Sequence, residues 1–339
     1  MILSNCSKIA PYLIAILILG CSGKETKHDL GKVRVVFDTD ANNELDDQHA
    51  LAYLLFNGGA FELAGVTVNA TRSGGNIDSQ YAEAERVMKL CGFENRLPLY
   101  KGANSTFDSI KNKVDTFWFD GRDAVNFIIA EAKILSERKL VVIAVGKLTN
   151  LALALKKEPS ITSRIRLVWL GSNYPEPGEY NLENDTASVN SVLKSGVEFE
   201  IVTVRYGKPS GSDAVKVTLD DVNRNLRGRG PIIAEPVSGR HGGSFTNFGD
   251  YSVSLFENIH LNSDHPSRAL FDMVAVAIVK NPAWGKKTEV TTHLLINNQW
   301  VEHPKSPRRI TVWGDFDKEK ILADFYKSIN EYHLVEVKE

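Results

Sequence analysis

The stretch that decides the fold is Val33-Arg34-Val35-Val36-Phe37-Asp38-Thr39-Asp40-Ala41-Asn42-Asn43-Glu44-Leu45-Asp46-Asp47-Gln48-His49-Ala50-Leu51. It begins with an apolar, β-branched run, which predicts a strand, and it ends in an apolar-periodic segment, which predicts a helix. Four Asp and one Glu lie within ten residues at the turn between them. Carboxylates crowded this closely repel one another, so a partly buried turn needs a compensating cation. Oxygen ligands suit Ca²⁺ or Mg²⁺, and the turn therefore predicts a metal site.

Strand and helix patterns alternate along the rest of the chain. Such alternation predicts an α/β fold with a doubly wound, mostly parallel sheet and helices on both faces. We expect a single domain over residues 32–339, in which residues 207–264 form loops and short helices over the site. Ligands bind such sheets at the carboxyl ends of the strands, where polar clusters fall in this chain: 38–47, 69–76, 145–150 and 171–185. The expected strands are 33–37, 61–69, 97–102, 139–145, 164–170 and 199–204, and the expected helices are 48–56, 79–90, 121–137, 151–157 and 187–195.

The N-terminus does not belong to that domain. Lys8 is followed by an apolar run over residues 11–21, and its roughly ten apolar residues are too few to span a bilayer, which predicts a signal peptide over residues 1–20. Ile18-Leu19-Gly20-Cys21 resembles the bacterial lipobox, which implies a lipidated Cys21 and a polar tether over residues 21–31. The protein would then be anchored to the bacterial cell envelope, on the periplasmic or the outer-membrane face. A secreted protein cleaved nearby, or an uncleaved anchor, is the alternative.

The charge and the cysteine content argue against a nucleic-acid-binding protein and against a fold stabilised by disulfides. The net charge is -2 and the charged residues are interspersed, so no basic face is available for nucleic acid. Of three cysteines, Cys6 would be removed with the signal peptide and Cys21 acylated, which leaves Cys91 without a partner for an intrachain disulfide. Cys91 lies in an apolar helical context, and we expect it in the core rather than as a nucleophile.

Four blocks of sequence resemble the inosine/uridine-preferring nucleoside hydrolases, calcium-dependent enzymes that hydrolyse the N-glycosidic bonds of ribonucleosides. Asp38-Thr39-Asp40 followed by Asp46-Asp47 is similar to the aspartate cluster of that family. Gly146-Lys147-Leu148-Thr149-Asn150 is similar to its Gly-Pro-Leu-Thr-Asn segment, and Gly178-Glu179-Tyr180-Asn181 to its Glu-Phe-Asn element. Phe271-Asp272-Met273-Val274-Ala275-Val276-Ala277 is similar to its His-Asp-Pro-x-Ala-Val-Ala helix. The blocks occur in the family's order over roughly residues 33–330.

The resemblance implies a Ca²⁺ site. Asp40, Asp47 and Asp272 would bind the ion through their side chains, and Val145 through its backbone carbonyl. Asp40 would also act as the general base that activates a metal-bound water. Hydrolysis of a C–N glycosidic bond passes through an oxocarbenium-like sugar, so it requires an activated water and fixed negative groups near the ribose. A bound cation can orient and acidify that water while a carboxylate takes the proton.

The resemblance also implies a set of polar side chains that hold the ribose hydroxyls. One of them is an acid next to the metal ligands, and three lie in the loop over residues 171–185. A further asparagine comes from the glycine-rich loop after the second expected strand. The candidates are Asp46, Glu179, Asn181 and Asn173, together with Asn76 or, by another alignment of that loop, Asn69.

Structural explanations stand beside several of these assignments. Asp46 and Asp47 could simply stabilise the N-terminus of a helix, although this leaves the acids at the strand end unexplained. Asn150 could serve only as an N-cap. Glu179 and Asn181 could be solvated residues of a loop rich in Pro and Gly.

The chain also departs from the family's pattern in three places, one of which is the absence of that family's Pro-Gly turn residues. The loop over residues 41–45 is two residues longer than usual, so it must bulge, and Glu44 could add a ligand or narrow the pocket. Phe271 replaces a His that assists departure of the base in some members. Another group would then protonate the base, or stacking by aromatic side chains would activate it; the candidate histidines are His49, His241 and His260.

The expected function is a calcium-dependent N-ribohydrolase that releases base and sugar from a small ribosyl substrate. Its oligomeric state stays open between a monomer and a homo-oligomer. One alternative is a phosphatase of the haloacid-dehalogenase type, because Val36-Phe37-Asp38-Thr39-Asp40 also resembles that family's strand followed by Asp-x-Asp; Asn42, however, stands where that family needs Thr or Val. A second alternative is a non-catalytic lipoprotein of the same fold that binds a sugar or glycoside.

Overall fold

The computed structural model describes residues 31–94, 96–261, 266–302 and 308–336. The chain divides into two compact units, residues 1–31 and residues 32–339. The expected signal peptide, the lipobox with Cys21 and all of the tether but Gly31 lie outside the described residues. Every element below belongs to the second unit.

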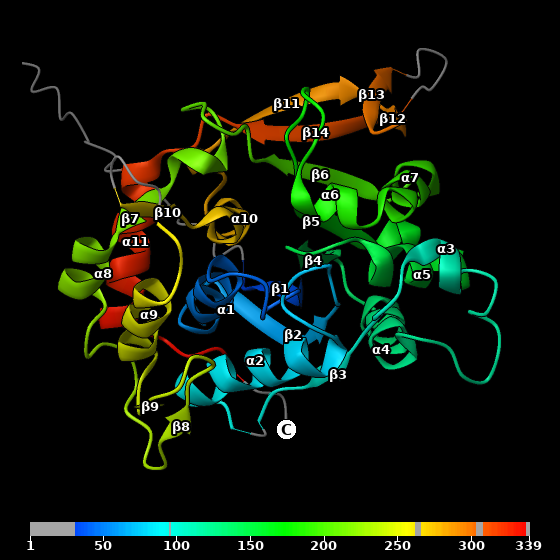
Figure 1. Ribbon diagram of the computed structural model, residues 1–339. Helices are drawn as coiled ribbons and strands as arrows, with labels where there is room; N and C mark the ends of the chain where they lie inside the picture. Colours follow the sequence, from blue (N-terminus) through cyan, green and yellow to red (C-terminus); the bar gives the residue numbers. More distant parts are fainter. Residues whose placement is uncertain (1–30, 95, 262–265, 303–307, 337–339) are drawn as a thin grey trace, which may run out of the picture. The chain divides into compact units, whose positions relative to one another are not determined.

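A sheet of eight strands forms the centre of this unit (Figure 1). In spatial order its strands are β11 (Lys286–Thr291), β14 (Arg309–Gly314), β6 (Glu198–Thr203), β5 (Ile165–Ser172), β4 (Leu140–Ala144), β1 (Val33–Thr39), β2 (Phe61–Val68) and β3 (Leu99–Lys101). Only the edge strand β11 runs antiparallel to its neighbour, and the other neighbouring pairs are parallel. The prediction of a mostly parallel sheet is therefore confirmed.

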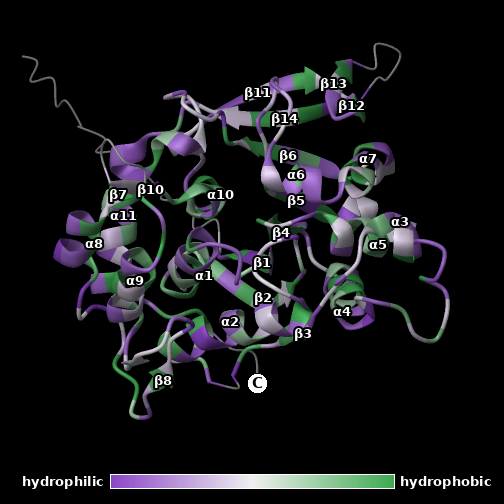
Figure 2. Cartoon of the chain, viewed as in Figure 1, coloured by the Kyte–Doolittle hydropathy of each residue, from purple (hydrophilic) through white to green (hydrophobic). Residues whose placement is uncertain are grey.

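Helices cover both faces of the sheet, which makes it doubly wound. The side chains of β1 alternate between two cores, with Val35 and Phe37 in one and Val36 in the other, because successive residues of a strand point to opposite faces. The first core also receives α1 (Asp46–Leu55), α2 (Ile77–Leu90), α8 (Leu219–Asn225), α9 (Phe248–Glu257), α10 (Phe271–Lys280) and α11 (Lys318–Asn330). The second receives α3 (Phe107–Ile110), α4 (Arg122–Lys133), α5 (Thr149–Lys157), α6 (Tyr180–Asn184) and α7 (Thr186–Ser195). Figure 2 shows the hydrophobic residues concentrated on the central strands and hydrophilic ones on an outer helix such as α8.

Smaller elements connect these layers. Three two-stranded antiparallel ladders are formed by β7 (Lys216–Thr218) with β10 (Ser267–Ala269), β8 (Val237–Ser238) with β9 (Ser244–Phe245), and β12 (His293–Ile296) with β13 (Gln299–Glu302). Short 3₁₀ helices are η1 (Pro159–Arg164), η2 (Ser212–Ala214) and η3 (Pro282–Trp284). Within the described residues, no helix is both long enough and apolar enough to cross a bilayer.

The helices differ from the expected ones at a few points. Helix α1 begins at Asp46 rather than at residue 48, so Asp46 and Asp47 occupy its first turn. The single-turn helices α3 and α6 lie in segments expected to be loops, because one turn is too short to produce a periodic pattern. Cys91 follows α2 and is fully buried, as expected, and burial raises the pKa of its thiol well above the usual value.

Candidate active site

A cavity of about 610 Å³ opens at the carboxyl edge of the sheet. Its lining comes from the turn after β1, the loop after β5 with α6, the loop after β6, and the segment that leads into α10. Parallel strands of a doubly wound sheet end at one edge, which brings these distant segments together. The cavity thus lies where the sequence placed the polar clusters.

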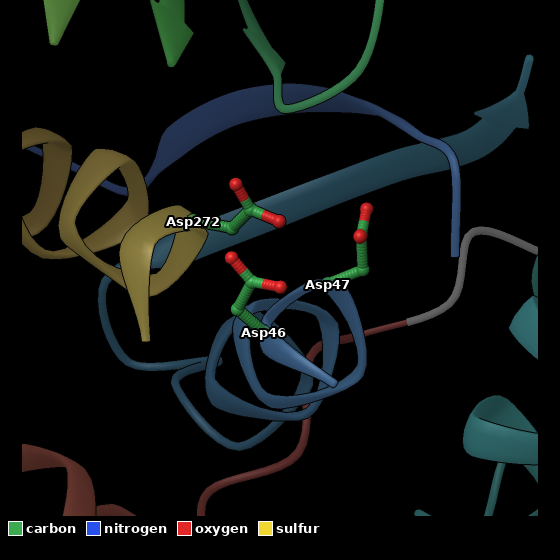
Figure 3. A group of neighbouring side chains, drawn as sticks. All are labelled: Asp46, Asp47 and Asp272. Atoms are coloured by element: carbon green, nitrogen blue, oxygen red, sulfur yellow. The ribbon is translucent and has the colours of Figure 1, made fainter. Parts of the chain in front are cut away.

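Three carboxylates meet in the wall of this cavity. Asp46 and Asp47 come from the first turn of α1, and Asp272 comes from the first turn of α10, which packs against α1. One carboxylate oxygen of each lies within 4.8 Å of one oxygen of each of the others (Figure 3). All three residues are buried. The two helix N-termini supply partial positive charge, and a bound cation would balance the remaining negative charge of three buried carboxylates.

Burial and mutual repulsion determine the pKa values of these three carboxyl groups. Burial raises the pKa of Asp46 and of Asp47 to about 7. The pKa of Asp272 is raised well above its usual value, first by burial and then by the charges of Asp46 and Asp47. A hard divalent cation bound through oxygens would relieve both the burial and the repulsion, and this donor set fits one.

Asp40 lies in the same cavity wall but outside that three-carboxylate cluster. It is buried, and its Oδ2 accepts a hydrogen bond of 2.5 Å from the hydroxyl of Thr71. Burial, and then the charge of Asp47, raises the pKa of Asp40 well above its usual value. A Cβ on Gly146 would lie 2.9 Å from Oδ1 of Asp40, so this position needs glycine to leave room for the carboxylate.

Asn181 connects the cavity wall to the strand ends. Its Nδ2 donates to the carbonyl oxygens of Val145 at 2.7 Å and of Leu170 at 3.2 Å. Its Oδ1 is buried and accepts no hydrogen bond from the part of the chain that the structure describes. Since buried polar atoms are nearly always satisfied, this oxygen is an acceptor left for a ligand.

Glu179 lies beside Asn181 in the same wall and is also buried. Its Oε2 accepts a hydrogen bond of 3.0 Å from the backbone N–H of Leu182 and so caps α6. Burial raises the pKa of Glu179 to about 7. The structure therefore brings together Asp40, Asp46, Asp47, Val145, Glu179, Asn181 and Asp272 around one cavity.

The other asparagines predicted to contact the sugar do not line the cavity. Asn76 is exposed and caps α2, where its Oδ1 accepts from the backbone N–H groups of Asp78 and Ser79, each at 3.1 Å. Asn173 accepts a hydrogen bond from the N–H of Tyr206 at 3.1 Å and so holds the loop after β6. In this structure, these two side chains fix loops near the cavity.

Asp38 forms a buried polar network behind the cavity. It accepts hydrogen bonds from Thr67 at 2.6 Å, Asn69 at 3.0 Å and Asn150 at 2.7 Å. Asn150 also donates to the carbonyl of Val68 at 3.1 Å and accepts from the N–H of residue 103 at 2.8 Å. The N-cap residue of α5 is residue 148, so the interpretation of Asn150 as a mere helix cap is wrong. Asn150 and Asn69 instead hold the ends of β1 and β2 together.

No described histidine lines the cavity. His49 is fully buried on α1, where its Nδ1 contacts the Leu45 carbonyl at 2.6 Å and its Nε2 contacts the Ser252 hydroxyl at 2.7 Å. Burial lowers the pKa of His49 to about 4. His241 and His260 are exposed away from the cavity. The three histidines considered as proton donors therefore do not face the site.

Three aromatic side chains form part of the wall instead, those of Tyr180, Tyr206 and Phe271. Phe271 precedes Asp272, and its ring meets that of Tyr206 edge to face, with centroids 6.1 Å apart. Burial raises the pKa of Tyr206, so the phenol stays protonated. These rings offer a planar ligand an apolar surface next to the acids.

The loop over residues 41–45 consists of turns and bends between β1 and α1. Asn42 holds it to the following segment, with its N–H on Oε1 of Gln80 at 2.6 Å and its Nδ2 on the Gly74 carbonyl at 2.7 Å. Glu44 lines the cavity, where it forms an ion pair with Arg268 and remains outside the three-carboxylate cluster.

Sequence reasoning missed Thr71, Tyr206 and Arg268. Thr71 shortly follows the end of β2. A polar residue at that position, next to the neighbouring strand that ends in acids, is a signal that could have identified it. Tyr206 and Arg268 gave no such signal, because an isolated Tyr or Arg in a loop-rich segment is usually solvated.

The comparisons with known proteins agree with this geometry. A family model described as inosine-uridine preferring nucleoside hydrolase matches residues 35–323. A probable uridine nucleosidase 2 of Oryza sativa subsp. japonica is 28% identical over 197 residues, which cover 50% of this chain and 56% of that protein. Uridine nucleosidase 1 of Arabidopsis thaliana is 25% identical over 230 residues, which cover 60% of this chain and 64% of that protein. The chain thus spans somewhat more than half the length of these relatives.

Among solved structures, an inosine-guanosine nucleoside hydrolase has a TM-score of 0.68 to this chain at 16% sequence identity. The match covers 89% of this chain and 100% of that one. At this identity the similarity concerns the fold.

Proposed function

Because this chain belongs to the inosine-uridine preferring nucleoside hydrolase family, we propose that it hydrolyses the N-glycosidic bond of a ribonucleoside or a related ribosyl compound. The observation that carries the proposal is the cluster of Asp46, Asp47 and Asp272, with Asp40 beside it in the same cavity. The family match includes residues 36–40, on which the phosphatase alternative rested, and that alternative loses its support.

We propose Ca²⁺ as the ion of this site, held by Asp40, Asp47, Asp272 and the carbonyl of Val145. All four groups offer oxygen and reach the same cavity. Asp46 also belongs to the three-carboxylate cluster, so it borders the ion as well as the sugar. A bound divalent cation would polarise a water and orient two sugar hydroxyls.

Asp40 takes the proton of the attacking water in this proposal. The hydrogen bond from Thr71 fixes one oxygen of its carboxylate, and the absence of a side chain at Gly146 leaves space beside the other. A base held in one orientation within hydrogen-bonding reach of its proton is what general base catalysis requires.

The remaining polar groups hold the sugar. The free Oδ1 of Asn181 accepts a hydrogen bond from one ribose hydroxyl, while Glu179 and Asp46 accept from others. The same negative charges stabilise the positive charge that develops on the ribose in the transition state. Phe271 and Tyr206 stack on the leaving base, since no described histidine is placed to protonate it.

We also propose that the protein is attached to the bacterial cell envelope through a lipid on Cys21. The support is the sequence Ile18-Leu19-Gly20-Cys21 after an apolar run. An envelope enzyme of this kind would act on nucleosides outside the cytoplasm.

The test is a panel of ribonucleosides incubated with the full-length protein and Ca²⁺. The free base is separated chromatographically, and the free sugar is measured by a reducing-sugar assay. We expect both products in equal amounts from at least one nucleoside. Saturable binding without either product would favour the sugar-binding alternative, and release of phosphate from sugar phosphates without ribose release from nucleosides would overturn the proposal.

A further inference from the structure

The lengthened loop over residues 41–45 brings one charged side chain, Glu44, into the cavity. Its position is fixed from two directions. The carbonyl of Glu44 accepts hydrogen bonds from Nη1 of Arg240 at 2.8 Å and from Nε2 of Gln48 at 3.0 Å. Its carboxylate forms an ion pair with the guanidinium of Arg268. Glu44 is therefore anchored in the cavity wall through both its backbone and its side chain.

Arg268 has hydrogen-bonding capacity that this ion pair does not use. The pair joins Nη2 of Arg268 to Oε2 of Glu44. Nε of Arg268 is buried, and no described residue accepts a hydrogen bond from it. A guanidinium carries five N–H donors and a carboxylate several acceptor sites, so both partners can bind a further group. The unpartnered, buried N–H of Arg268 points to a ligand.

The two partners lie at the ends of the segments that carry the acids. Glu44 shortly precedes Asp46 and Asp47, and Arg268 shortly precedes Phe271 and Asp272. The proposed sugar contacts Glu179 and Asn181 come from the loop after β5 and from α6, a different part of the wall. In the proposed function the acids hold the ion, and the residues at α6 hold the ribose. The wall that contains Glu44, Arg268 and Phe271 then remains for the base.

We propose that the Glu44–Arg268 pair is the specificity-determining contact for the base, and that it binds a base whose edge presents an N–H donor beside a carbonyl acceptor. This inference rests on the proposed nucleoside hydrolysis. The carboxylate accepts from the N–H and the guanidinium donates to the carbonyl oxygen, while Phe271 packs on the ring. Because the charges of the pair cancel, the contact selects a neutral, polar-edged base rather than an anionic substrate.

Two matched pairs of nucleosides isolate this contact. Inosine carries the N–H and carbonyl at its base edge, and purine riboside lacks both. Uridine and pyrimidin-2-one riboside differ in the same way. For each pair, kcat/KM is measured with wild type, Glu44→Gln, Arg268→Met and the charge-reversed double variant Glu44→Arg/Arg268→Glu. Arg227→Met, which removes an exposed guanidinium that pairs with Glu257 outside the cavity, is the matched control.

For each pair we divide kcat/KM for the parent, inosine or uridine, by kcat/KM for the analogue that lacks the N–H and the carbonyl, here called the deleted nucleoside. We expect this ratio to fall about tenfold in either single variant, which is the effect of losing one hydrogen bond to a charged group. The value for the deleted nucleoside should change little. The double variant Glu44→Arg/Arg268→Glu should re-form the ion pair and recover the melting temperature of the wild-type protein. It should not recover the wild-type ratio of kcat/KM. Arg227→Met should keep the wild-type ratio.

If the variants lose the same share of activity on both nucleosides of a pair, the ratio of kcat/KM does not change. This result would show that the ion pair is purely structural and would overturn the inference. A wild-type enzyme that cleaves the deleted nucleosides as well as their parents would overturn it too, while leaving the proposed function intact. Failure of the wild type to cleave any nucleoside of the wider panel would overturn the proposed function itself. Arg268→Lys, which keeps the charge, is the second variant if Arg268→Met does not fold.

Discussion

The hydroxyl of Thr71 donates a hydrogen bond of 2.5 Å to Oδ2 of Asp40, although the two residues lie 31 positions apart. Each follows the carboxyl end of one of two neighbouring parallel strands, β1 and β2, whose pairing brings Thr39 opposite Val68. Asp40 lies in the cavity wall, and Thr71 is buried behind it. The orientation of the proposed general base is therefore set by the pairing of two strands.

Thr71→Val removes this hydrogen bond while it keeps the shape of the side chain. We expect kcat to fall about tenfold, the effect of one charge-assisted hydrogen bond, with a smaller change in KM, because Thr71 orients Asp40 rather than the substrate. Thr71→Ser should keep most of the activity. Steady-state kinetics on the best nucleoside of the panel measures both constants. Thr288→Val, on the exposed edge strand β11, is the control, and equal loss of activity in both valine variants would contradict the prediction.

Asp40→Asn removes the proposed base. We expect kcat/KM to fall at least about a thousandfold, since a general base and a metal ligand are lost together. In the absence of metal the melting temperature should not fall, because the repulsion between Asp40 and Asp47 is relieved. Activity assays and thermal unfolding in a chelator measure the two effects. Asp220→Asn on the surface of α8 is the matched control, and activity of Asp40→Asn within tenfold of wild type would exclude Asp40 as the base.

Removal of the metal should both inactivate and destabilise the protein. A cation present at a hundred times its dissociation constant stabilises the folded state by about 2.7 kcal/mol, and chelation removes that contribution. Added Ca²⁺ should restore activity and melting temperature. Calcium titration calorimetry on Asp40→Asn and Asp46→Asn then shows which of the two carboxylates binds the ion. A melting temperature that does not respond to chelator or Ca²⁺ would contradict the metal site.

Asn150→Ala should destabilise the fold without touching the cavity. It leaves one oxygen of Asp38, the Val68 carbonyl and the N–H of residue 103 without this partner, all of them buried. We expect a loss of about 3 kcal/mol in the free energy of unfolding, since each unsatisfied buried group costs about 1–3 kcal/mol and part of the network relaxes. Urea unfolding at constant Ca²⁺ measures it. Asn225→Ala, whose side chain bonds only a carbonyl of its own helix in α8, should lose less than about 1 kcal/mol.

Cys21→Ala tests the envelope anchor. In bacteria that process lipoproteins, we expect the wild-type protein in the membrane fraction and in the detergent phase of a phase separation, because acyl chains partition into lipid. The variant should move to the aqueous phase or be retained as an uncleaved precursor. Cys91→Ala changes a buried thiol of the core and should leave the distribution unaltered. Metabolic labelling with a fatty acid that is equal in wild type and Cys21→Ala would contradict the anchor.

The mostly parallel sheet, the alternation of its strands and helices, and the edge where the polar clusters gather could all be predicted from the chain alone. Apolar runs such as the one in β1, the acids that follow them and the apolar periodicity of α1 are local features of the chain. A strand buried on both faces must be apolar along its length, so β4 is recognisable without tertiary information. The carboxyl ends of parallel strands share one edge, which makes the position of Asp40 and Asp47 predictable as well.

The directions of the individual side chains depend on how the helices pack, which the sequence pattern does not reveal. Asp46, Asp47 and His49 lie within one turn of α1, yet the acids face the cavity and the imidazole faces a core of aromatic rings. The three-carboxylate cluster contains Asp46 where the resemblance had implied Asp40. The acids of the turn between β1 and α1 need a counter-charge from another part of the chain or from a bound ion. Asp272 completes their cluster, and Arg268 neutralises Glu44, because α10 packs on α1, and no local pattern in the sequence records that packing.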